Sequence, residues 1–247
     1  MIFPQPTIDW YPQLKVFDTP DFSFNAELHE YRYKGEKFPS VTGIIEQFHE
    51  KFDSDYWSAI KAEERGVDQS VVLAEWKAKA DRSCDLGTMV HEYAEFVTAG
   101  KKPPLVTDPD ALRGIAKLDK IFATKLKNII PVAQEIRIFS PKLKLAGTID
   151  GLFEYKNKLI IGDYKTNEKF TTDEDRCFRN MLPPFENQLD NKLNIYSTQV
   201  SLYRVMLEEW GIKTEAAFLV HIPHGDAPAK FYPAKDFTKE LKQYFKI

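Results

Sequence analysis

Three β segments follow one another between Ile129 and Lys165, separated only by short polar turns. β-branched and alternating apolar residues set their bounds at Val132 to Phe139, Leu145 to Tyr155 and Leu159 to Tyr164. Segments so close in sequence pair most simply as antiparallel strands, and the second hairpin turns at Lys156-Asn157. The sequence therefore predicts a three-stranded antiparallel unit with a defined register in its second hairpin.

That register brings two carboxylates together. In a hairpin that turns through Lys156-Asn157, Asp150 lies directly opposite Asp163, with Cβ atoms about 5 Å apart. Two negative charges at this spacing repel each other, and a hard divalent cation such as Mg²⁺ or Mn²⁺ bound between them reverses the sign of the interaction. We therefore expect a metal site on this hairpin.

Lys165 lies two residues beyond Asp163 and projects from the same face of the strand. An ammonium there can stabilise a developing anion or help to deprotonate an attacking water. The alternative is that both residues are ordinary charges at the end of a strand. However, Asp163 ends the apolar run Leu159 to Gly162, where a charge is costly unless it is used.

A helix predicted over Ser70 to Ala99, with a break near Asp85 to Gly87, supplies a further ligand. His91 and Glu95 lie four residues apart on one face of this helix. A neutral imidazole there would complete the metal site, although a lone helix histidine is more often solvated. The zincin motif HExxH is similar, but Glu95 replaces its second histidine, which excludes that three-ligand zinc site.

Glu135 is a fourth candidate at the same place. It falls opposite Asp150 if the first hairpin turns through Lys142-Leu143. A further acidic group beside the site and a solvated strand glutamate are equally consistent with the sequence.

The rest of the chain divides into an N-terminal arm and hairpin over 1–38, a helical part over 39–128 and an α/β core over 129–247. The order of helices, three strands, helix and strand predicts an α/β sandwich. We expect a hairpin at Glu30–Phe38 that turns at Lys34-Gly35 and strands at Ala216–Ile222 and Lys230–Tyr232. Helices are expected from Ser40 or Thr42 to His49, from Ser54 to Gly66, and over Asp108–Asn128, Asp190–Trp210 and Phe237–Phe245.

Composition excludes several classes of protein. Lys and Arg number 34 against 37 Asp and Glu, so nucleic acid could be bound only by a local basic patch. Cys84 and Cys177 are the only cysteines, which excludes a four-cysteine iron–sulfur or zinc site within one chain. No apolar run approaches the ~18 residues of a membrane span, and MIFPQPTIDWYPQL lacks the features of a signal peptide. We expect a cytoplasmic protein with no membrane partner.

Four motifs in this order resemble the RecB-like nuclease domain of the PD-(D/E)xK superfamily, which includes several phage exonucleases and the mitochondrial genome maintenance exonuclease. The motifs are Gly87-x-x-x-His91-x-x-x-Glu95, Gly147-x-x-Asp150, Asp163-x-Lys165 and Gln199-x-x-x-Tyr203. Pro39-Ser-Val-Thr42 is similar to a further segment of that group. The resemblance runs from Pro39 to Tyr203 and implies a restriction-endonuclease-like core, a central mixed sheet flanked by helices.

The resemblance also implies roles for individual residues. His91, Asp150, Asp163 and the backbone carbonyl of Tyr164 would hold Mg²⁺ or Mn²⁺. Lys165 would be the catalytic lysine. Gln199, with Tyr203 one turn later, would border the active site and help to place the DNA or the lysine, and Tyr203 and Glu95 would contact the substrate.

The function implied is that of a metal-dependent deoxyribonuclease, an exonuclease on single-stranded DNA or frayed ends in replication, recombination or repair. No iron–sulfur cluster is expected, in contrast to some relatives. The chain has no P-loop or helicase motif, so a helicase or a single-strand-binding protein would be a partner.

Candidate DNA contacts are weaker predictions. The start of the helix at Ser40 to Thr42 offers backbone N–H groups to a phosphate. Arg176, Arg179 and Lys192 follow Lys165 in a charged segment, and Tyr196 or Trp57 could stack on unpaired bases. The alternatives are a solvated charged surface and, for Trp57, a place in the core.

Three other functions stay open from the sequence. A structure-specific endonuclease would use the same chemistry on branched or flap DNA. A catalytically silent DNA-binding module would be expected to have lost Lys165 or one of the acids, and all are present. A metal hydrolase with another substrate explains the acids and His91 but leaves Lys165 and Gln199-x-x-x-Tyr203 unexplained.

Overall fold

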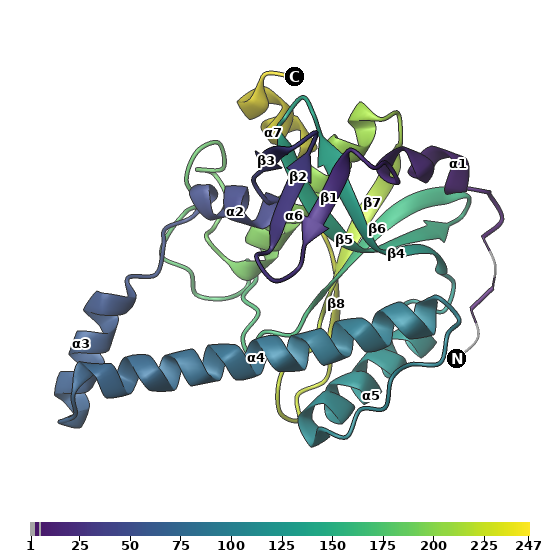
Figure 1. The fold of residues 1–247 in the computed structure, drawn as a ribbon. Helices are drawn as coiled ribbons and strands as arrows, with labels where there is room; N and C mark the ends of the chain where they lie inside the picture. The colour runs from purple at the N-terminus through teal and green to yellow at the C-terminus, as the bar shows by residue number, and fades with distance from the viewer. Residues whose placement is uncertain (1–2, 5) are drawn as a thin grey trace.

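A five-stranded sheet lies at the centre of the computed structural model, which describes residues 3–4 and 6–247 (Figure 1). Its order is β4-β5-β6-β7-β8, and only the β6–β7 pair is parallel. The sheet is therefore mixed, and the fold is α/β as predicted. The strands are β4 Ile130–Ser140, β5 Leu145–Tyr155, β6 Lys158–Lys165, β7 Thr214–His221 and β8 Lys230–Pro233.

The β5–β6 hairpin has the predicted register. Tyr155 pairs with Lys158 and Gly151 with Gly162. Lys156 and Asn157 form the turn with φ angles of 51° and 62°, the left-handed pair that a tight hairpin with right-handed strand twist requires. Asp150 and Asp163 therefore lie one position beyond Gly151 and Gly162, the last pair of this ladder.

The β4–β5 hairpin has the predicted centre but a longer turn. Ser140 pairs with Leu145, which leaves four residues in the loop rather than two. A two-residue turn would require Pro141 to pair with Lys144, and proline has no N–H to donate to the ladder. The side-chain hydroxyl of Ser140 instead accepts a hydrogen bond from the Leu143 N–H at 3.0 Å.

Helices cover both faces of the sheet. α4 (Gln69–Thr98) and α5 (Pro109–Thr124) pack on one face, around Val90, Leu118 and Phe122. α6 (Lys192–Glu209) packs on the other face, and α7 (Thr238–Phe245) follows it. α3 (Ser54–Arg65) lies against the start of α4, and both project beyond the sheet (Figure 1). No helix among the described residues has the length and apolarity needed to cross a membrane.

α4 is continuous, so the predicted break near Asp85 to Gly87 is wrong. A single glycine inside a helix costs only about 1 kcal/mol relative to alanine, and no proline interrupts this stretch. Gly87 has a packing role, because a Cβ there would lie 2.8 Å from the Thr166 side-chain hydroxyl just beyond β6. The glycine lets α4 approach the end of that strand.

The N-terminal region contains more structure than predicted. The expected hairpin forms as β2 (Glu30–Tyr33) and β3 (Glu36–Phe38), and β1 (Phe22–Asn25) adds a third strand. Before these strands lie α1 (Tyr11–Leu14), with a proline in its first turn, and η1 (Lys15–Phe17). Tyr31 and Phe38 share one core with Ile138 and Ile149, so this small sheet packs on the central one.

The helix predicted from Ser40 to His49 is shorter and divided. α2 spans Val41–Ile45, and a 3₁₀ turn, η2, follows at Glu46–Phe48. Ser40 caps α2 as expected, because its hydroxyl accepts a hydrogen bond from the Gly43 N–H at 3.0 Å.

A buried carboxylate holds the N-terminal arm against the central sheet. Glu154 near the end of β5 is 1% exposed and accepts hydrogen bonds from the backbone N–H of Thr7 at 3.2 Å and of Ile8 at 3.1 Å. The indole N–H of Trp10 donates to the same carboxylate at 2.9 Å. The sequence held no sign of this contact, because its partners lie about 145 residues apart.

We expect Glu154→Gln to lower the free energy of unfolding by about 2 kcal/mol, because donors that faced a carboxylate would meet an uncharged amide. Urea unfolding measures this as a lower midpoint with an unchanged slope. Glu215→Gln is the control, since Glu215 is exposed and, within the part of the chain that the structure describes, its carboxylate pairs only with Lys158 on the surface. A Glu154→Gln midpoint equal to that of the unmutated protein would show that these bonds do not hold the arm.

Candidate metal centre

Three side chains from three elements converge beside the β5–β6 hairpin. His91 on α4, Glu135 on β4 and Asp150 on β5 each place one potential ligand atom within 4.8 Å of the others. His91 Nδ1 lies 3.6 Å from Asp150 Oδ2 and 3.8 Å from Glu135 Oε1. The group therefore contains one imidazole and two carboxylates, the donor types expected of a divalent-cation site.

The Asp150 side chain is held in place by a hydrogen bond to the neighbouring strand, in addition to the backbone pairing of β5. The β5–β6 backbone ladder ends at Gly151 and Gly162. One step further, Asp150 Oδ2 accepts a hydrogen bond from the Tyr164 N–H at 2.8 Å. The carboxylate thus replaces a backbone partner and is held across the hairpin next to Asp163.

Glu135 reaches the group through an unusual backbone conformation. Its φ is 47°, in the left-handed region that a non-glycine residue rarely adopts within a strand. Gln134 and Ile136 on either side pair normally with β5, with Gly151 and Ile149. Flanking pairs of this kind can hold a strained residue in place, and such strain is concentrated at functional sites. Of the two alternatives for Glu135, the structure favours the acidic group at the site.

His91 lies between opposing electrostatic influences. Burial lowers the pKa of the imidazole, but the carboxylates of Asp150 and Glu135 outweigh it and raise the pKa to about 9. His91 Nε2 also lies 3.0 Å from the carbonyl oxygen of Tyr164. The positively charged imidazolium therefore balances two carboxylates, and a divalent cation among the same groups would supply that charge in place of the proton.

Asp163 and Lys165 form a pair next to this group. Asp163 is 2% exposed, and its Oδ2 lies 2.8 Å from Lys165 Nζ. Apart from this contact with the ammonium, no donor among the described residues reaches Oδ2. Burial raises the pKa of Asp163 to about 6; Asp150 adds to the increase, and Lys165 opposes it. A buried carboxylate oxygen that can still accept further interactions is typical of a residue close to a bound cation.

Lys165 is held by α6. Its Nζ donates to Gln199 Oε1 at 3.2 Å and lies 4.6 Å from the centre of the Tyr196 ring. Gln199 Nε2 in turn donates to the hydroxyl of Tyr203 at 3.3 Å. Burial lowers the pKa of Lys165, but Asp163 and Asp150 outweigh it and raise the pKa above its ordinary value. Lys165 is therefore an ammonium at neutral pH, which favours charge stabilisation over proton abstraction.

Glycine gives Tyr203 its place in the site. A Cβ on Gly147 would lie 2.7 Å from the Tyr203 ring, so any larger residue would push that ring away from β5. Gly147 and Tyr203 belong to two separate sequence motifs, and this close approach is a physical reason for their joint presence. Tyr196 lies three residues before Gln199 on the same helix face, a spacing that could have indicated its role beneath Lys165.

The donor set fits Mg²⁺ or Mn²⁺. His91, Glu135 and Asp150 offer one nitrogen and carboxylate oxygens within a small space, and the Tyr164 carbonyl lies beside His91. Carboxylate and carbonyl oxygens are the ligands that these hard ions prefer. Asp163, expected among the ligands, is paired with Lys165 and lies outside the group of converging atoms, although the Asp150 charge still acts on it.

The residues predicted to contact DNA do not gather in one place, and their surroundings differ. α2 has only five residues, and the Ser40 hydroxyl already accepts the Gly43 N–H, so a phosphate contact at its start stays a prediction; Thr42 is exposed beside it. Arg179 pairs with Glu50, whereas Arg176 lies over the Phe178 ring.

Three further predicted contacts lie on helices. Lys192 at the start of α6 lies 5.8 Å from the centre of the Tyr196 ring. The side chain of Glu95 makes no hydrogen bond or ion pair with any residue that the structure describes. Trp57 is 46% exposed on α3, so its alternative place in the core is wrong.

Comparison with known proteins adds little to this geometry. No family model matches the chain, and no curated protein matches it in sequence. A solved structure described as "Crystal structure of SSO0001" aligns with 13% sequence identity and a TM-score of 0.28 over 53% of each chain. The alignment thus spans about half of both proteins, and at that TM-score it carries no argument about fold or function.

Proposed function

We propose that this protein is a metal-dependent nuclease that hydrolyses phosphodiester bonds in DNA, as an exonuclease on single strands or frayed ends. The observation that carries the proposal is the meeting of the His91–Glu135–Asp150 group with the buried Asp163–Lys165 pair. The sequence motifs support it, because the residues at their chemical positions come from four separate elements to one end of the sheet. We further propose a restriction-endonuclease-like core as the finer description of the α/β fold.

Hydrolysis of a phosphodiester is assisted by positive charge close to the phosphate and to the attacking water. The water oxygen bonds to phosphorus and the water gives up one proton to solvent, while the P–O bond to the leaving oxygen breaks and that oxygen takes up one proton from solvent. A divalent ion among His91, Glu135 and Asp150 would supply positive charge to the phosphate and acidify the attacking water. The Lys165 ammonium would stabilise negative charge that develops on the phosphoryl oxygens.

The remaining residues keep that lysine in position. The Asp163 carboxylate compensates the buried ammonium, and Gln199 accepts one of its N–H groups. Tyr203 fixes the Gln199 amide, since its hydroxyl accepts from Nε2. Such a chain of contacts fixes the direction of the ammonium before substrate arrives, which is the condition for electrostatic catalysis without reorganisation.

The test is to incubate the protein with end-labelled linear and circular single-stranded DNA in Mg²⁺, Mn²⁺ or EDTA. We expect metal-dependent loss of the linear strand only, with no loss in EDTA. Cleavage of the circle would instead establish an endonuclease. Binding of both without cleavage in either metal would contradict the proposal and favour a silent DNA-binding module.

A further inference from the structure

A large groove opens directly beside the metal centre. It has a volume of about 910 Å³, within the range of sites that bind small molecules. Its floor is the segment of β4 over 132–137, apart from Gln134, and its other side is formed by the N-terminal arm, α1, η1 and β1. Glu135 lines the groove and also belongs to the group with His91 and Asp150, so the groove lies next to the candidate metal centre.

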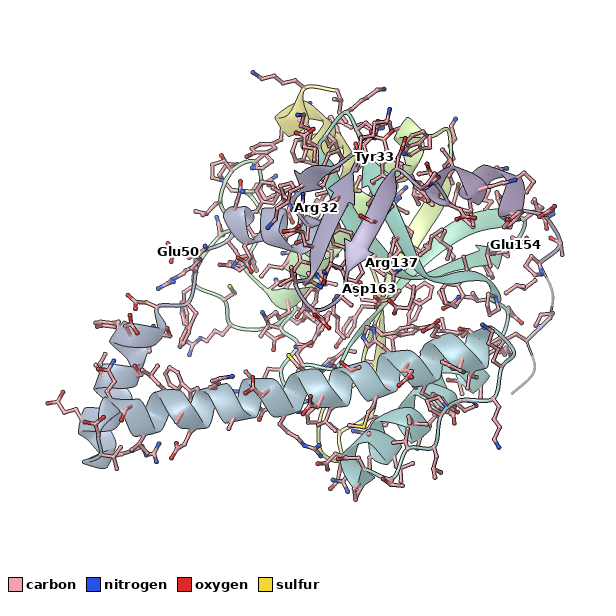
Figure 2. All side chains as sticks on the ribbon, in the orientation of Figure 1. Arg32, Tyr33, Glu50, Arg137, Glu154 and Asp163 are labelled. Carbon is pink, nitrogen blue, oxygen red and sulfur yellow. The ribbon has the colours of Figure 1, made fainter. Side chains whose placement is uncertain are left out.

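The groove has a limited length. Glu154, which holds the arm, lies four residues beyond Asp150 on β5 and on the same face of that strand. At about 3.3 Å per residue the arm therefore crosses roughly 13 Å from the metal centre. Figure 2 shows Glu154 on the side of the sheet where the arm runs. A groove of this length can hold the base, sugar and phosphate at the end of a DNA strand, but it is too short for a long continuous DNA strand.

Flat aromatic surfaces line this space. Trp10, Tyr11, Phe22 and Phe24 all face the groove, and Tyr11 is 64% exposed. The exposed Tyr11 ring offers a stacking surface to a nucleobase, independent of base identity, and the half-buried rings of Trp10, Phe22 and Phe24 extend the apolar lining. The lining is thus suited to a flat ring system of the size of a base.

Arg137 provides the complementary charge. It lies two residues from Glu135 on β4, about 7 Å along the strand, and Figure 2 shows it close to the end of β1. Its guanidinium lies 4.9 Å from the centre of the Phe24 ring. Among residues 3–4 and 6–247 it has no ion-pair partner and donates no hydrogen bond to another residue. A stacked guanidinium keeps its N–H donors in a fixed plane that suits a phosphate.

We propose that this groove binds the terminal nucleotide of the DNA strand, with the base among the aromatic rings and a phosphate on Arg137. The inference rests on the proposed nuclease function and adds to it the place where the end of the substrate lies. Two acids at the arm side, Asp9 and Asp18, also line the groove. Asp9 accepts a hydrogen bond from the Tyr11 N–H at 3.1 Å, which fixes the start of α1 beneath that ring.

The test uses dAMP and deoxyadenosine as probes, with binding measured by calorimetry in EDTA so that no cleavage or metal contributes. We expect the unmutated protein to bind dAMP on the order of ten-fold more tightly than deoxyadenosine, since only dAMP carries the phosphate. Arg137→Gln is expected to abolish that preference. Tyr11→Ala is expected to weaken both probes equally, because the stacking surface serves both.

Arg32→Gln is the matched control. Arg32 on β2 is also an exposed arginine, but it pairs with Glu30 and lies outside the groove lining. No binding of dAMP, equal binding of the two probes, or equal losses in Arg32→Gln and Arg137→Gln would each overturn the groove assignment. DNA cleavage without dAMP binding would refute the groove alone, whereas dAMP binding without cleavage in any metal would refute the nuclease alone.

Discussion

Lys165→Ala is expected to lower the rate of DNA cleavage by about 10²- to 10³-fold while DNA affinity stays within about threefold of the unmutated value. The reason is geometric. Lys165 is 17% exposed, is paired with Asp163 and is directed by Gln199, so its ammonium is organised for charge that appears during the reaction. Single-turnover cleavage of end-labelled single-stranded DNA measures the rate, and binding in Ca²⁺ or EDTA measures the affinity.

Lys158→Ala is the matched control for this experiment. Lys158 begins the same strand, is exposed and pairs with Glu215 far along the sheet from the metal centre. Its loss should leave both rate and affinity unchanged. If Lys165→Ala loses as much affinity as rate, the lysine is a phosphate contact and not a group that acts on the transition state.

Removing Lys165 also leaves Asp163 buried without its partner. The carboxyl is expected to take up a proton rather than to unfold the protein, because burial already raises its pKa to about 6. Circular dichroism and the urea midpoint of the variant separate this local change from loss of the fold. A loss of activity with an intact fold is the result that supports the catalytic role.

The sequence was most informative where structure is local. A tight turn at Lys156-Asn157 sets the register of its hairpin, so the positions of Asp150 and Asp163 follow from counting residues. The hairpin at Lys34-Gly35 follows from the same chemistry, with Tyr33 paired with Glu36. Periodicity likewise located α5 and α6, since their apolar faces pack on the sheet.

The features that the sequence did not predict depend on contacts between residues that lie far apart in the sequence. The left-handed φ of Glu135 is fixed by β4 and β5 together, and no local preference of glutamate favours it. The order of the N-terminal arm depends on Glu154, a partner near the middle of the chain. The close approach of α4 to Thr166 at Gly87 is likewise a contact between distant parts of the chain. Local propensity cannot express any of these constraints, because each belongs to tertiary packing.

Asp150→Asn is expected to abolish metal-dependent cleavage and to weaken Mn²⁺ binding by at least about ten-fold. The substitution removes one of two carboxylates that converge with His91, and with it a large part of the negative charge that favours a cation there. The asparagine carbonyl can still accept the hydrogen bond from the Tyr164 N–H, so the hairpin is expected to keep its geometry. Calorimetric titration with Mn²⁺ and the linear-strand cleavage assay measure the two effects.

Glu92→Gln controls for the loss of one negative charge near the site. Glu92 is exposed on α4 beside His91 but is not one of the converging ligands. A long-range electrostatic effect would weaken Mn²⁺ similarly in both variants and fall with added salt, because charges in water are screened over about 10 Å. Direct ligation predicts a large loss in Asp150→Asn alone, at any ionic strength. Unchanged Mn²⁺ affinity in Asp150→Asn would show that the metal does not bind at the His91–Glu135–Asp150 group. The Asp163–Lys165 pair would then have no metal ion beside it, and the proposed mechanism would fail.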